Sequence, residues 1–297
     1  MTQVREGLRP ARPGWLSVNL VVSTVVLLAV ACLVALSVLT ARLPAPAQLV
    51  DPAPLWLIAV FFVLAALAEV IYVPVRHADS WEELAFVEVV VIWAVLVLSP
   101  LTAIVTCLLG FAFTAAIMRR PLVKSLFNLG AYAIAAVGLM ITYYMLDSGA
   151  DIFSVRSVLA LVVAALLFAG LNLVLLSVIL YAAGDVPPRE FLQEQAGLSV
   201  GMAVGSVGVS TITLATLQYT PALTPFAALP AVALWYAYRA SSSHAEARER
   251  SRWLVVLGQA VATPGEPEDV IPRAADALRR VYGADERLIA REIVWPA

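Results

Sequence analysis

The sequence predicts an all-α integral membrane bundle of about eight transmembrane helices, with N- and C-termini in the cytoplasm and a short α/β cytoplasmic tail. Three observations predict this fold class: the composition, a series of long apolar runs, and the distribution of Lys and Arg beside those runs. Hydrophobic residues make up 62% of the 297 positions, only 13% are charged, and the mean hydropathy is +0.90. Soluble domains are about half apolar and about a quarter charged. This excess of apolar side chains requires a lipid bilayer as its solvent.

The apolar runs set the number of helices, because a spanning helix needs roughly 20 mostly apolar residues. The stretch from Trp81 to Met118 would be about 57 Å long as one helix, nearly twice the ~30 Å hydrocarbon core. Pro100 removes a backbone donor near its midpoint, so we expect two helices joined by a tight turn at Ser99-Pro100. The expected spans are 15–40, 55–75, 82–99, 101–118, 125–146, 157–183, 197–218 and 222–239.

Lys and Arg beside the runs set the orientation. They precede the first run, follow every even-numbered run, and are sparse on the opposite side. Cytoplasmic loops carry an excess of these residues, which predicts a multi-pass protein of the cytoplasmic (inner) membrane. Residues 1–14 form a cytoplasmic arm and residues 15–239 the transmembrane bundle. The basic residues are Arg5, Arg9, Arg12, Arg76, Arg119, Arg120, Lys124, Arg189, Arg239, Arg248, Arg250 and Arg252.

Four polar residues lie inside the apolar runs: Glu69, Glu88, Asn128 and Asn172. An acid at the centre of a membrane helix costs roughly 2.5 to 3.5 kcal/mol on insertion scales, so each needs a reason. In one interpretation, the four residues line a polar pocket that binds a small ligand or a cation. In the other, they are interhelical hydrogen-bond partners with a structural role, and the glutamates are protonated or paired.

Other features exclude several classes of function. No broad basic face is present, which argues against nucleic acid as a partner. Cys32 and Cys107 lie inside apolar runs and are interpreted as small hydrophobic residues. No set of nucleophile, acid and metal ligands indicates an enzyme, and no cofactor or metal is expected. Gly201 and Gly205 form a small-xxx-small pattern, for which we expect close helix packing inside the bundle.

The composition changes sharply after Arg239. Residues 240–262 predict a cytoplasmic connecting helix with one apolar stripe, which could carry movement out of the bundle and is a candidate surface for a homodimer. The same pattern fits equally an ordinary amphipathic helix that lies on the lipid headgroups. A break at Thr263 to Pro267 is followed by a second amphipathic pattern and one expected strand. A segment of this size cannot form a sheet with its own core. We therefore expect residues 263–297 to be the start of a domain that is not completed here.

Two stretches carry a resemblance to a known family. The sequence RRPLVKSLFNLGAY at 119–132, after a helix pair with a Ser-Pro turn, resembles the N-terminal membrane regions of actinobacterial multidomain signalling proteins. Those regions precede GAF domains and then cyclic-di-GMP enzymes of GGDEF, EAL or HD type. The sequences LVVLGQAVA at 254–262 and ALRRVYGAD at 277–285 look like the opening helices of a GAF domain. The enzyme motifs themselves do not occur, so the family's nucleotide chemistry maps onto no residue of this chain.

The leading hypothesis is a sensory input module that passes a ligand or membrane state to a cytoplasmic signalling partner or output absent from this chain. The order of bundle, connecting helix and GAF-like start supports it. The alternative is a small-molecule or ion transporter, supported by the same buried acids. A structural membrane protein without a ligand is the third interpretation. In all three, the lipid bilayer is a partner.

Overall fold

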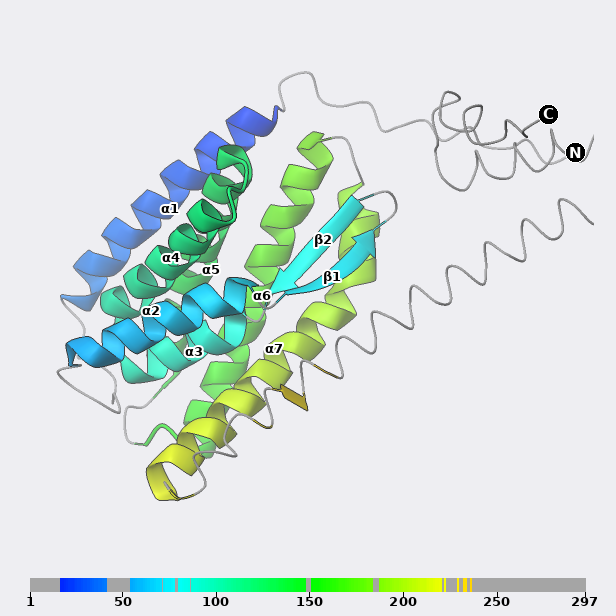
Figure 1. Cartoon of the computed structure of the whole chain (residues 1–297). Coiled ribbons are helices and arrows are strands. Elements are labelled where there is room, and N and C mark those ends of the chain that lie inside the picture. Colours follow the sequence, from blue (N-terminus) through cyan, green and yellow to red (C-terminus); the bar gives the residue numbers. More distant parts are fainter. Residues whose placement is uncertain are drawn as a thin grey trace, which may run out of the picture. The chain divides into compact units, whose positions relative to one another are not determined.

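The computed structural model describes residues 17–41, 54–70, 72–77, 80–85, 87–147, 151–183 and 187–220, with five single positions between 222 and 236. Two compact units divide these residues: the helices belong to one unit and a two-stranded sheet to the other. Figure 1 labels the elements in chain order. They are α1 (Val18–Thr40), α2 (Leu55–Val70), β1 (Tyr72–His77), β2 (Ser80–Ala85), α3 (Val87–Val97), α4 (Pro100–Ile117), α5 (Leu122–Leu146), α6 (Val155–Ala183) and α7 (Pro188–Tyr219).

Five of the described helices are long and apolar enough to cross a membrane: α1, α4, α5, α6 and the Gln195–Tyr219 part of α7. Many of their large apolar side chains are exposed; for example, Leu27 is 70% exposed and Leu159 is 59% exposed. Lipid chains solvate such side chains, whereas water does not. The prediction of an all-α, multi-pass membrane bundle is confirmed by these helices. The remaining two, α2 and α3, are apolar but shorter.

Two expected spans are wrong at one end. The span expected over 55–75 stops at Val70, and the span expected over 82–99 begins only at Val87, because β1 and β2 lie between them. Pro74 has no backbone donor for a helix, and the residues beside it in the sequence YVPVRH favour extended backbone. Apolar content alone does not distinguish helix from strand in so short a stretch.

The expected break at Ser99-Pro100 is confirmed. Helix α3 ends at Val97, Ser99 is the N-cap of α4, and Pro100 is its first residue. Proline is favoured at this position because its missing N–H would have no partner there anyway. Of the span expected over 222–239, only five single positions are described. The arm at 1–14, the connecting helix at 240–262 and the GAF-like segment at 263–297 lie outside the described residues.

The helices of the bundle pack in a chain of neighbours. Helix α5 packs against α1 and α6, α6 against α7, α2 against α4, and α3 against both α4 and α7. Gly110 permits the contact of α4 with α2, since a Cβ at this position would lie 2.7 Å from the carbonyl oxygen of Phe62. Cys107 is buried in this core and Cys32 is half-buried beside it, both as free thiols.

Helix α7 is longer than expected and presents a different face to the bundle. It begins at Pro188 instead of residue 197. The prediction that Gly201 packs inside the bundle is wrong, because nothing lies within 4 Å of its Cβ position. The residues buried along α7 include Ala203, Ser206 and Ser210, each 0% exposed. The small-xxx-small spacing does not show which side of a helix meets its neighbours.

Candidate functional site

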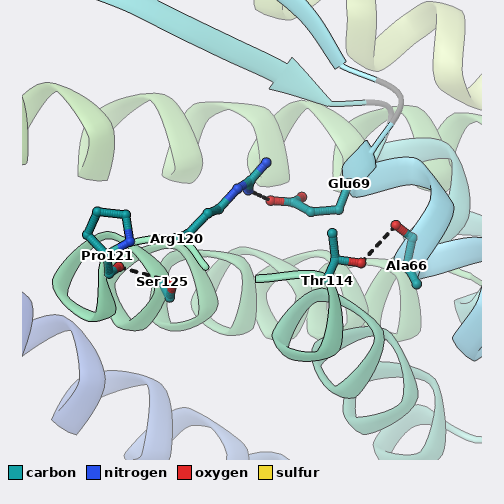
Figure 2. Close-up of polar contacts among 6 residues, drawn as sticks. All are labelled: Ala66, Glu69, Thr114, Arg120, Pro121 and Ser125. Carbon is teal, nitrogen blue, oxygen red and sulfur yellow. Dashed lines mark hydrogen bonds and ion pairs between the residues drawn. The ribbon is translucent and has the colours of Figure 1, made fainter. Parts of the chain in front are cut away.

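An ion pair joins α2 to the turn between α4 and α5. The guanidinium Nη1 of Arg120 donates to Oε1 of Glu69 (Figure 2). The side chains of Arg120 and Glu69 are only 11% and 5% exposed. A carboxylate withdrawn from water in this way needs an opposite charge close by, because an unpaired buried charge is expensive. Arg120 supplies that charge from 51 positions further along the chain.

The end of α4 places Arg120 for this contact. The amide of Arg119 donates to Ala116 O at 3.2 Å, and the amide of Arg120 donates to Ala115 O at 3.1 Å. These two bonds form a Schellman motif, which ends a helix with one residue in the left-handed conformation. Arg119 is that residue, with φ of 52°. The tight reversal brings Arg120 out of α4 directly before Pro121, the N-cap of α5.

Helix α2 is held against α4 one turn before Glu69. The hydroxyl of Thr114 donates to the carbonyl oxygen of Ala66 at 3.0 Å (Figure 2). The rings of Phe62 and Phe113 lie next to each other, with centroids 5.4 Å apart. Together with the close approach at Gly110, these contacts set the register of the two helices. The register fixes the position of Glu69 relative to the end of α4.

Glu69, Arg120 and Asn128 line a small pocket with room for about one water molecule. Pockets for drug-sized ligands are far larger, so this one suits only a water molecule, a small ion or one polar group of a larger molecule. The rings of Phe111 and Tyr132 form part of its wall, with centroids 5.2 Å apart. Its other lining residues are Ala115, Ser125 and Leu129.

The structure brings two of the four predicted polar residues together. Glu69 and Asn128 line the same pocket. Glu88 lies on α3 and does not line this pocket; the polar group beside its carboxyl group is the hydroxyl of Ser206 on α7. Asn172 is half-buried on α6 and is not among the lining residues either. The expected single pocket of four residues is therefore divided between separate parts of the bundle.

Sequence analysis did not identify Arg120 as a partner of Glu69. Arg120 was interpreted only as one of the cytoplasmic basic residues that set the orientation. One signal could have found it: a buried acid needs a cation, and the end of α4 is the basic segment that membrane topology places on the same side as the end of α2. The buried hydroxyls of Ser206 and Ser210 were also missed, because Ser is common in membrane helices.

A polar network closes the turn between α5 and α6. The Ser157 hydroxyl lies 2.5 Å from Asp147 Oδ1 and 2.7 Å from the carbonyl oxygen of Asp151. The Ser157 amide donates to Ser154 Oγ at 3.1 Å, and Arg156 Nε donates to Leu146 O at 3.2 Å. These bonds satisfy backbone and side-chain groups at two helix ends. We interpret this network as a structural cap.

The described residues contain no group of three or more His, Cys, Asp and Glu that could hold a metal ion. The charged centre of the bundle is instead the Glu69–Arg120 pair with its small pocket. Comparison of the chain with protein-family models, curated proteins and solved structures found no match.

Proposed function

We propose that this protein is a sensory input module, in which the membrane bundle passes a ligand or membrane state to a cytoplasmic output or partner. The signal would leave through the helix expected at 240–262, which would also form the contact between two copies. The GAF-like sequence at 254–262 and 277–285 supports this direction of signalling.

The observation that carries the proposal is the buried Glu69–Arg120 pair. It links the end of α2 to the α4–α5 turn, and it lies at a pocket that also contains Asn128. A small ion or polar group entering this pocket would compete for the same charges. A buried charge without a partner is unfavourable. Two arrangements are therefore favourable: one in which Glu69 and Arg120 pair with each other, and one in which a bound ligand pairs with the charges instead. A ligand that separates the pair would shift α2 relative to α4.

The proposed topology has both termini in the cytoplasm and about eight passes in the inner membrane. This count adds three further spans to the five long helices: α2, the short buried α3 and the apolar run 222–239. Helices α2 and α4 are the second and fourth spans in this count, so their C-terminal ends are expected on the same side of the membrane. The ion pair between Glu69 and Arg120 supports that placement. The basic residues Arg119, Arg120 and Lys124 support the cytoplasm as that side.

A reporter of dimerisation fused to the C-terminus of the full chain tests the sensor function. We expect Arg120→Gln and Glu69→Gln to change the reporter signal, and the double variant Glu69→Arg with Arg120→Glu to return it toward the wild-type value. Arg189→Gln, which changes an exposed Arg on α7, is the matched control. If every variant folds and all of them give the wild-type signal, the ion pair does not take part in signalling.

Transport of a small molecule or ion is a second candidate function, and one specific observation favours it. Helix α3 has 11 residues and is therefore about 16 Å long, roughly half the hydrocarbon thickness. Nine of these residues are buried. In the apolar 18-residue segment of each of the five long helices, only 28% to 56% of the residues are buried. Short helices enclosed by protein are typical of transporter binding sites. Uptake into proteoliposomes that survives deletion of residues 245–297 would favour transport over sensing.

A further inference from the structure

A second polar centre lies between α3 and α7, apart from the Glu69–Arg120 pocket. Ser206 and Ser210 are one helical turn apart on α7, so they lie on the same face, and both are 0% exposed. Helix α7 packs against α3. The carboxyl group of Glu88, in the first turn of α3, lies beside the hydroxyl of Ser206. The Glu88 carboxyl group and the Ser206 hydroxyl therefore lie at the contact between α3 and α7, and Ser210 lies on the same face of α7 one turn further along.

Three oxygen atoms of this centre lack a hydrogen bond of normal geometry, although the Ser206 hydroxyl lies close to the Glu88 carboxyl group. Among the residues that the structure describes, Glu88 Oε2, Ser206 Oγ and Ser210 Oγ are buried and have no hydrogen-bond partner. Serine hydroxyls in membrane helices usually donate to a carbonyl oxygen of their own helix, as Ser177 does to Val174 O at 2.7 Å. Ser206 and Ser210 do not. Eight buried side-chain atoms of the described residues lack a partner of this kind, and these three lie on two helices that pack against each other, which points to a ligand.

We propose that Glu88, Ser206 and Ser210 bind a monovalent alkali cation between α3 and α7. The carboxylate supplies one negative charge, which a monovalent cation neutralises. The two hydroxyls offer neutral oxygen ligands of the kind that hard cations take. A divalent ion usually takes more carboxylates, and the described residues contain no group of three or more His, Cys, Asp and Glu. The site does not depend on the Glu69–Arg120 pair on which the proposed sensor function rests.

The position of the site agrees with this assignment. Helix α3 is short, nine of its eleven residues are buried, and Glu88 itself is half-buried in the first turn. A bound cation would join α3 to α7 through oxygens from both helices. Occupancy would therefore stabilise the packed bundle, because it adds a contact that the unfolded chain cannot make.

Thermal unfolding of the purified full-length chain in detergent tests the site, with sodium chloride, potassium chloride and choline chloride compared at equal ionic strength. We expect a saturable rise in Tm with Na⁺ or K⁺ but not with choline, of several degrees at about 100-fold excess over Kd. Ser206→Ala and Ser210→Ala should weaken the apparent affinity for the cation about 10-fold or more. Glu88→Gln should abolish the rise. Ser177→Ala, which removes a buried hydroxyl that donates within its own helix, should retain it.

Three results would overturn the proposal. The first is an equal Tm in all three salts for the wild-type chain. The second is a rise of the same size in Ser206→Ala and Ser210→Ala, which keep the carboxylate and serve where Glu88→Gln does not fold. A Tm that follows pH but none of the metal salts would also overturn it, because the carboxyl group would then bind only a proton. Retention of ²²Na⁺ by wild-type protein and its loss in Ser206→Ala would support it directly.

Discussion

The guanidinium group of Arg120 pairs with the carboxylate of Glu69 inside the protein, where neither side chain is more than 11% exposed. This pair connects two helix ends that are 51 positions apart in the chain. It depends on a chain reversal at Arg119 and on the close packing of α2 against α4 at Gly110. Each of these features leads to a separate prediction.

Removing one partner of the pair should be more harmful than removing both. Arg120→Gln leaves the Glu69 carboxylate buried without its cation, and we expect it to lower the free energy of unfolding by about 3 to 5 kcal/mol. The double variant with Glu69→Gln should recover most of this loss, because no charge then remains buried. Thermal unfolding of the four proteins in detergent completes the double-mutant cycle. Additive losses from the two single changes would contradict a direct interaction, and Arg189→Gln should stay within about 0.5 kcal/mol of wild type.

Arg119→Gly should stabilise the protein. Arg119 has φ of 52°, and a side chain in this left-handed region costs about 1 kcal/mol, which glycine does not incur. The expected gain in the free energy of unfolding is therefore about 1 kcal/mol, measured as a rise in Tm. Arg119→Ala controls for the lost charge and should bring no gain, since alanine keeps the Cβ. A Tm for Arg119→Gly that is no higher than that for Arg119→Ala would contradict the argument from backbone conformation, because both variants lose the charge.

Gly110→Ala should loosen the contact between α2 and α4. The new Cβ would lie 2.7 Å from the carbonyl oxygen of Phe62 and 2.8 Å from the Cβ of Ala65, so backbone must move. We expect a loss of about 1 to 3 kcal/mol in the free energy of unfolding. Gly201→Ala is the matched control: it has open space around its Cβ, and helix propensity predicts a slight gain. The idea fails if both substitutions change Tm in the same direction by the same amount.

Cysteine labelling should place the two ends of α5 on opposite sides of the membrane. Helix α5 has 25 residues and is about 37 Å long, enough to cross the hydrocarbon core. In a background in which Cys32 and Cys107 are replaced by Ala, Arg119→Cys should react with an impermeant maleimide only after the cells are opened. Asp151→Cys should react in intact cells. The reverse pattern would place the termini outside the cytoplasm, against the distribution of Lys and Arg.

Composition and the length of the apolar runs were sufficient for the membrane class, for five long helices and for the break at Ser99-Pro100. These properties act locally, since transfer into lipid depends on about 20 successive side chains and proline acts on its own backbone. Short stretches were less certain. Residues 72–77 and 80–85 form two strands, because β-propensity and Pro74 outweigh an apolar content that is compatible with a helix.

The candidate sites depended on contacts that no local pattern encodes. Sequence alone marked Glu69 and Glu88 as costly, but the folded chain decided that Arg120 meets Glu69 and that Ser206 lies beside Glu88. It also decided that Gly201 faces away from the bundle while Gly110 faces into it. The physical reason is that helix periodicity defines the faces of each helix, whereas the choice of face follows from packing against helices distant in the chain.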